Sequence, residues 1–206
     1  TIYFNDTETH TFHAYYPYQS DGGTVTVSTA ADKQGADIDF LFASGATGDT
    51  HNPTVSFTGD HAFHHCMSLI KFTFKAGDGL SFNETEPAGY TLEGLKHEGT
   101  FDTATGTTAV TAASESPITM QLGGATTSQV IILPQEVTSS LNLKVSYNGQ
   151  SYNAQLKLPA TPTANFYTAG YAYTYNITLN NKDIEVSDPT INPWESGDSN
   201  DASAEL

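Results

Sequence analysis

The sequence contains no arginine and only seven lysines, against 23 aspartates and glutamates, so its formal net charge is -16 over 206 residues. A surface this acidic repels phosphate backbones and anionic lipid head groups. Without arginine, no side chain can hold a phosphate through two parallel hydrogen bonds. We therefore expect no nucleic acid among the partners of this chain.

Cysteine is nearly absent as well, since Cys66 is the only one. A single cysteine excludes a disulfide within the chain and any metal or redox motif built on paired cysteines. No apolar run approaches the ~20 residues that a membrane-spanning helix needs, so we expect no transmembrane segment in this chain. The sequence starts at Thr1 without an initiator methionine or a signal-like apolar segment, which we interpret as a processed or shortened form.

Sustained helical patterns are also missing, because no segment keeps a helical period over three turns. Short clusters of Gly, Thr, Ser and Asn with apolar alternation between them predict a mainly β protein. We expect two tandem β-sandwich domains, over residues 1–83 and 84–197, followed by an acidic tail over 198–206. The compositional break NETEPAG at 83–89 separates the two domains in this prediction.

A hairpin around Asn148-Gly149 is the firmest local prediction, because this pair tolerates the two positive φ angles of a type I′ turn. With this turn Tyr147 faces Gln150, and the register of both strands follows. The apolar residues then pair on one face: Leu141 with Leu156, Leu143 with Ala154, and Val145 with Tyr152. A register shifted by one residue would separate these pairs.

Other strands follow from the same period-two reasoning. Residues 166–179 alternate, and their large side chains share one face: Tyr171, Tyr173, Tyr175, Ile177 and Leu179. The unbroken apolar segment VIIL at 130–133 predicts a strand covered on both faces. A strand from His64 places a further set on one face: Cys66, Ser68, Ile70, Phe72 and Phe74.

The histidines beside Cys66 superficially offer metal ligands. On a helix His61 and His65 would share a face, but this segment leads into a strand, where alternation separates His64 from its neighbours. We therefore expect half-exposed or hydrogen-bonded histidines and no metal site.

Candidate catalytic groups have structural explanations too. Ser151 lacks the final glycine of a nucleophile elbow and lies in a hairpin strand. Alternation places Asp37 and Asp39 on one solvated face, and linker composition accounts for Glu84 and Glu86. The tail residues with possible calcium ligands lack the EF-hand spacing: Asp198, Asn200 and Asp201. We expect no catalytic residue, no cofactor and no enzymatic activity.

Exposed aromatic residues give a second functional hypothesis, a surface glycan-binding module. The chain has 11 tyrosines and 11 phenylalanines, most of which fall on strand faces that a core would bury. Tyr15 and Tyr16 are adjacent in a strand, so they must face opposite sides. Tyr16 is therefore the aromatic that we would substitute to test glycan binding.

The order of the β-patterned segments resembles the fimbrillin-like family of Bacteroides-type surface fimbriae. The segments that carry the resemblance are FHAYYPY at 12–18, DIDFLFA at 37–43, VSFTGDHAFHHCMSLIKFTF at 55–74, GTFDTATG at 99–106, VIILPQ at 130–135, LNLKVSYNGQSYNAQLKL at 141–158, FYTAGYAYTYNITL at 166–179 and IEVSDPTINPWESG at 184–197. This resemblance implies transthyretin-like sandwich domains, export as a lipoprotein precursor, and a place in a filament on the outer-membrane surface.

The same resemblance implies how subunits would join. Family chains carry further β-strands ahead of the segment like AYYPY, so the first domain is expected to lack its leading strands. Members that assemble by strand exchange lose a leading strand to proteolysis, often after arginine; with no arginine here, such a cleavage site would lie before Thr1. Other fimbrial subunits are then the expected partners, with host or bacterial surface ligands as further candidates.

The end of the chain is the candidate segment for exchange or docking. Its apolar anchors are Ile184, Val186, Ile191 and Trp194. An incoming extended segment satisfies the unpaired backbone groups of a sheet edge and seats alternate side chains in core pockets. The alternative is that these four residues complete the second domain's own sheet.

Overall fold

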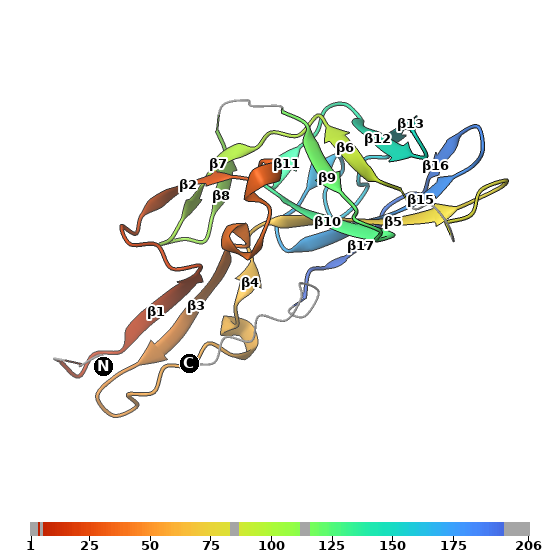
Figure 1. Cartoon of the computed structure of the whole chain (residues 1–206). Helices are drawn as coiled ribbons and strands as arrows, with labels where there is room; N and C mark the ends of the chain where they lie inside the picture. Colours follow the sequence, from red (N-terminus) through yellow and green to blue (C-terminus); the bar gives the residue numbers. More distant parts are fainter. Residues whose placement is uncertain (1–3, 5, 83–86, 112–115, 196–206) are drawn as a thin grey trace.

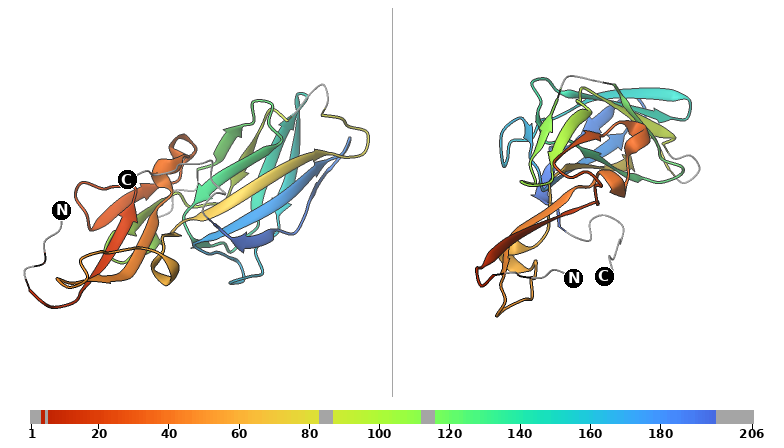
Figure 2. Two further views of the ribbon diagram at one scale, coloured as in Figure 1. Left: turned by 90° about the horizontal axis from the view of Figure 1, so that it is seen from below. Right: turned by 90° about the vertical axis from the view of Figure 1, so that its left-hand side faces the viewer.

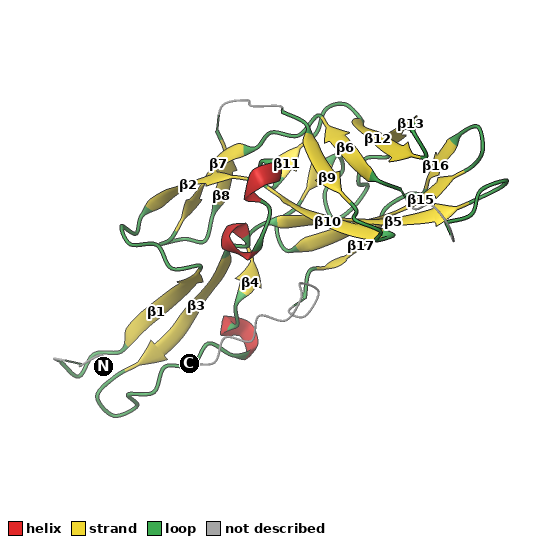
Figure 3. Cartoon of the chain, viewed as in Figure 1, coloured by secondary structure: helices red, strands yellow, loops and turns green. Residues whose placement is uncertain are grey.

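The computed structural model describes residue 4 and residues 6–82, 87–111 and 116–195. This part of the chain forms 17 β-strands and three short 3-10 helices, as the sequence patterns predicted for a mainly β protein. Figure 1 shows two regions along one long axis, and Figure 3 shows how little of the chain is helical.

The larger region is a sandwich of two sheets, which Figure 2 shows from two further sides. The first sheet comprises β10 (Thr127–Ile132), β5 (Ser68–Ala76), β15 (Tyr171–Leu179) and, beyond β15, both β16 (Ile184–Val186) and β17 (Thr190–Pro193). The second comprises β13 (Gln150–Leu156), β12 (Leu141–Tyr147), β6 (Gly89–Glu93) and β9 (Ile118–Gln121). Two short strands pair beside them, β11 (Gln135–Glu136) and β14 (Phe166–Tyr167).

The smaller region contains two three-stranded sheets. One comprises β1 (His10–Tyr16), β3 (Leu41–Gly48) and β4 (His64–His65), and the other comprises β2 (Thr24–Ser28), β7 (Glu98–Asp102) and β8 (Thr108–Val110). The helices are η1 (Ala31–Lys33), η2 (Ala36–Ile38) and η3 (Gly59–His61). In Figure 1, β1 and β3 form a ribbon that extends away from the sandwich.

Two apolar clusters hold these sheets together. The sandwich core joins the two large sheets, for example through Phe72 on β5 and Tyr90 on β6, whose ring centroids are 5.0 Å apart. The second core fills the space between the sandwich and the smaller region, and includes Phe40 stacked on Phe101 at 4.5 Å. Burying such side chains is worth roughly 1.5–3 kcal/mol each, so both clusters stabilise the arrangement of the sheets.

The sheet β10-β5-β15 contributes side chains to both clusters. Val130 and Ile132 lie in the sandwich core, whereas Ile131 and Leu133 lie in the second core. The prediction that VIIL is covered on both faces is therefore confirmed. On β15 the predicted apolar face also lies in or against the sandwich core, but Ala172 on the opposite face is buried in the second core rather than exposed to water.

The hairpin prediction is confirmed in turn and in register. Asn148 and Gly149 both have positive φ, at 46° and 73°. The pairing of β12 with β13 reproduces every predicted pair: Leu141 with Leu156, Leu143 with Ala154, Val145 with Tyr152, and Tyr147 with Gln150.

The strand predicted from His64 is interrupted, so the predicted placement of Cys66 was wrong. β4 ends at His65 and β5 begins at Ser68, and Cys66 lies in the second core. The cause is a change of neighbours, because the Cys66 backbone N donates to Phe40 O on the β3 side (2.7 Å) while Met67 O accepts from Gly170 N (2.8 Å). Residues 166–179 are likewise divided into β14 and β15 by a turn at Gly170, which has φ 74°.

Strand pairing crosses the predicted domain boundary after residue 83. β5 precedes it but pairs with β15 and β10, which follow it, and β2 pairs with β7 in the same way. The boundary therefore does not coincide with a division between sheets, and the two-domain arrangement stays a prediction. The predicted tail over 198–206, with its candidate calcium ligands, and residues Glu84 and Glu86 lie outside the described residues.

Candidate functional site

The candidate exchange segment covers one edge of β15. β16 pairs with the second half of β15 and β17 with the first half, so two short strands complete the sheet. Three of the four predicted anchors are half-buried and pack against the sandwich core: Ile184, Val186 and Ile191. The segment thus lies on its own chain, as the alternative interpretation has it, and its role in polymerisation stays a prediction.

Trp194, the fourth anchor, closes the segment against the smaller region. It is 5% exposed, and its ring stacks on His65 at a centroid distance of 3.9 Å and an angle of 3°. Its backbone N donates to Gly170 O (2.7 Å). His65 in turn has its Nδ1 2.7 Å from Asp39 Oδ1, so a buried pair from the β3 and β4 side supports the stack.

The prediction that Asp39 lies on a solvated face with Asp37 was wrong. Asp37 is exposed, but η2 ends between the two residues and Asp39 is 8% exposed. The 3-10 turn breaks the strand alternation, so the two carboxylates point in different directions. Asp39 lies between the core residues Ile38 and Phe40, and that position was the available signal for a buried carboxylate.

Two buried polar atoms at the contact between Trp194 and His65 lack hydrogen bonds. His65 Nε2 and Trp194 Nε1 are buried without a hydrogen-bond partner among the described residues. Such an atom costs about 1–3 kcal/mol relative to its solvated state. The closed position of the segment therefore carries a penalty that its release into water would remove.

Another candidate for strand pairing is the edge of β8 that no described strand covers. Among the described strands β8 pairs only with β7, and two cavities of about 430 and 510 Å³ lie along its other side. The cavities share Thr108, Pro134 and Phe166 in their walls, so they adjoin each other. An unpaired strand edge beside open space is the geometry in which an added extended segment can pair.

The other histidines of the cluster have separate partners. His61 Nδ1 lies 2.9 Å from Ser44 O, and the His64 ring meets the Phe42 ring edge-on at 6.2 Å. Within the described ranges no group of three or more His, Cys, Asp and Glu side chains could hold a metal ion. Burial raises the pKa of the Cys66 thiol to about 12, so this thiol stays protonated and unreactive at neutral pH.

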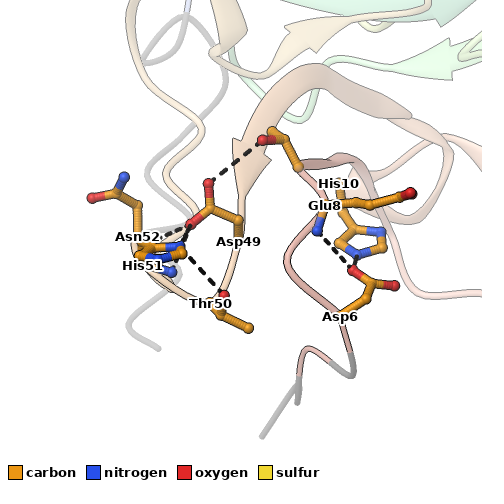
Figure 4. Close-up of polar contacts among 8 residues, drawn as sticks. Asp6, Glu8, His10, Asp49, Thr50, His51 and Asn52 are labelled. Carbon is orange, nitrogen blue, oxygen red and sulfur yellow. Dashed lines mark hydrogen bonds and ion pairs between the residues drawn. The ribbon is translucent and has the colours of Figure 1, made fainter.

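The polar groups at the tip of the β1–β3 ribbon stabilise turns (Figure 4). Asp49 Oδ1 accepts hydrogen bonds from the backbone N of His51 and of Asn52, both at 2.7 Å. These two bonds lower the pKa of Asp49, and the bond from Asn52 has the larger effect. Nearby, His10 Nε2 lies 2.8 Å from Asp6 Oδ1. Both carboxylates thus bind groups of their own loops, and Asp49 Oδ2 also accepts a hydrogen bond from Thr9 Oγ1 across the ribbon tip (3.5 Å).

The two adjacent tyrosines at the end of β1 face opposite sides, as predicted. The Tyr15 ring lies edge-on to the core residue Phe101 at 6.3 Å, whereas Tyr16 is 42% exposed. Tyr18, which belongs to the same segment but not to the adjacent pair, is 81% exposed. It follows a proline in a connection, where strand alternation gives no information about burial.

Comparison with known proteins identifies the family. A model described as fimbrillin-like matches residues 1–194. The chain belongs to the fimbrillin-like family. This result confirms the resemblance found in the sequence and gives the chain a class of structural and adhesion proteins, not enzymes.

Relatives in Bacteroides agree with this assignment. The chain is 30% identical to a Bacteroides uniformis protein named "Putative fimbrium subunit Fim1C", over 96% of the chain and 66% of that protein. The crystal structure of a Bacteroides uniformis protein named "putative cell adhesion protein" aligns with a TM-score of 0.80 and 26% identity, covering 94% of this chain and 77% of that one. Another, from Bacteroides ovatus, aligns with a TM-score of 0.75 and 27% identity, covering 95% and 71%.

This fimbrillin-like chain corresponds to only part of the length of its relatives. The chain spans 66% of the length of the curated relative, so the partners of the whole protein are a matter for proposal. Among the described residues no helix is long and apolar enough to cross a membrane.

Proposed function

We propose that this chain is a structural subunit of a bacterial cell-surface fimbria and joins other subunits by β-strand complementation. Family membership and the fimbrium subunit among its relatives support the first part. The observation that carries the second part is the edge of β15, which, among the described strands, only the short β16 and β17 cover. The expected export route, as an outer-membrane lipoprotein precursor, belongs to the same proposal.

The segment from Ile184 to Trp194 is the proposed donor. In a swapped joint it would make on a neighbour's β15 the same contacts that it makes on its own, since an exchanged element meets an identical surface. The two conformations then differ little in contact energy. The unpaired polar atoms at Trp194 and His65 lower the cost of the released state through which the segment passes from one to the other. The segment could therefore be exchanged between two copies of the chain without the formation of a new kind of interface.

A reversible lock on the segment tests this proposal. Thr174 and Thr190 are directly paired between β15 and β17. Paired residues of antiparallel strands have Cα atoms about 4.5–5.5 Å apart, within the range that a disulfide can bridge. The variant Thr174→Cys with Thr190→Cys should therefore hold β17 on its own chain when oxidised, and the buried Cys66 thiol should not interfere.

The measurement is electron microscopy and size-exclusion chromatography of the full-length precursor before and after limited proteolysis. We expect the oxidised lock to give monomers only, and reductant to restore polymers. A matched pair, Thr91→Cys with Thr119→Cys, joins β6 to β9 and should polymerise in both redox states. Polymers of the oxidised Thr174/Thr190 variant equal to those of the reduced protein would refute exchange of this segment.

A further inference from the structure

Two of the three exposed large hydrophobic side chains in the described part of the chain lie together. Tyr16 ends β1 and Tyr18 lies in the connection to β2, so that they flank Pro17 at 42% and 81% exposure. Phe63 lies beside β4 at 40%. The side chain of neither tyrosine makes a hydrogen bond or a ring contact with another described residue. Exposed apolar side chains that gather in one place can mark binding surfaces.

The connection that carries these rings is anchored on both sides. Tyr15 packs on Phe101 and its hydroxyl donates to Gln19 O at 3.3 Å. Gln19 Nε2 donates to Pro17 O (3.4 Å), and the Thr103 backbone N donates to Gly23 O (2.9 Å). An anchored loop loses little conformational entropy when a ligand binds, so its exposed rings are suited to recognition.

The position of the connection also leaves it accessible. In Figure 1 it lies on the left of the molecule, on the side away from β13 and β16. The proposed joint at β15 and β17 is a separate surface. A ligand at the tyrosines would therefore leave the exchange segment free.

The chemistry of the patch fits a sugar better than a protein. A stable protein interface needs about 800 Å² on each partner with an apolar centre, and here two rings stand among polar residues. Ser20 and Asp21, next along the chain, are both exposed. Aromatic faces pack on the C–H face of a pyranose, and the phenol, serine and carboxylate oxygens can hydrogen-bond its hydroxyls.

Charge narrows the class of sugar. The chain has a formal net charge of -16 and no arginine to hold a carboxylate or sulfate. The negative charge of the protein thus repels acidic sugars at long range. No arginine is present to bind their carboxylate or sulfate through two hydrogen bonds. We propose that Tyr16 and Tyr18 form a carbohydrate-binding site that stacks on a neutral pyranose ring.

A glycan array with matched neutral and sialylated oligosaccharides tests this site. The chain is presented as a multivalent complex, because avidity reveals weak single-site binding. We expect binding to at least one neutral glycan and a weaker signal for its sialylated counterpart. Calorimetry with the best neutral glycan should give an affinity about tenfold lower for Tyr18→Ala and for Tyr16→Ala, and near the original value for Tyr18→Phe.

Phe63→Ala is the control, because it removes a comparably exposed ring from another element and should leave glycan affinity unchanged. Fimbrial assembly should be normal in all four variants, which separates this site from the proposed joint. The inference is overturned if no neutral glycan binds, if both tyrosine-to-alanine variants bind as before, or if Phe63→Ala weakens binding equally. Loss of assembly in Tyr18→Ala without a glycan signal would assign the tyrosines to a subunit contact instead.

Discussion

At the scale of single residues, the buried tyrosines link stability to alkaline pH. Burial raises the pKa of Tyr90 to about 12, although its hydroxyl shares a 3.0 Å hydrogen bond with Ser128 Oγ. Burial also raises the pKa of Tyr175 to about 12. Unfolded tyrosines titrate near pH ~10, so above that pH the unfolded chain loses protons that the native state keeps. The stabilisation that comes from keeping these tyrosines protonated is therefore fully present below about pH 10. It is lost as the pH rises towards about 12.

We expect the free energy of unfolding to fall by about 1.4 kcal/mol per pH unit for each such tyrosine between about pH 10 and 12. Tyr90→Phe removes one contribution, so urea denaturation followed over this range should show a shallower slope. Tyr18→Phe changes a tyrosine that is 81% exposed and should keep the original slope. Equal slopes for Tyr90→Phe and the unchanged protein would contradict this account.

Gly106 shows how one backbone position can support the second core. It has φ 71°, and an added Cβ would overlap the ring of the buried Phe42. Gly106→Ala should combine left-handed strain with overpacking and cost about 2–4 kcal/mol in thermal or urea denaturation. Gly123 has φ 58° with no atom near its Cβ position, so Gly123→Ala should show only the smaller backbone cost. Similar losses in the two variants would mean that contact with Phe42 is not the cause.

At the scale of elements, the sequence predicts structure where local chemistry decides it. The Asn148-Gly149 hairpin follows from two adjacent residues and an alternation on each side, and its full register was predicted. The break between β4 and β5 depends instead on Phe40 and Gly170, which lie far away along the chain. Periodicity reports which way a side chain points, but it carries no information about a change of neighbouring strand.

In the candidate site, too, some features follow from local sequence and others depend on residues far apart in the chain. The exposure of Tyr16 could be predicted because Tyr15 and Tyr16 share a strand. The pair of Asp39 and His65 could not, because it joins a 3-10 turn to a strand 26 positions later. The stack of Trp194 on His65 is more distant still, and only the folded chain brings these residues together.

At the scale of the whole molecule, stability depends on the segment that we propose to be exchanged in assembly. β16, β17 and Trp194 complete the first sheet and close the second core. Deleting residues 181–206 removes these contacts, and we expect a loss of at least about 3 kcal/mol, since Trp194 is buried and three aliphatic side chains are half-buried. The melting temperature should fall by about 6–12 °C, because 1 kcal/mol shifts it by roughly 2–4 °C at this size.

A synthetic peptide covering residues 182–195 should then restore the truncated chain in trans, because it carries β16, β17 and Trp194. Trp194 is the only tryptophan in the sequence, so all tryptophan fluorescence in the mixture comes from the peptide. We expect its emission to shift to shorter wavelength and saturate as the ring enters the site beside His65, while the melting temperature recovers. The matched peptide with Ile184→Asp and Ile191→Asp should give neither effect. If the unaltered peptide also leaves fluorescence and melting temperature unchanged, even when it is present during refolding, the edge of β15 does not accept a strand from another molecule.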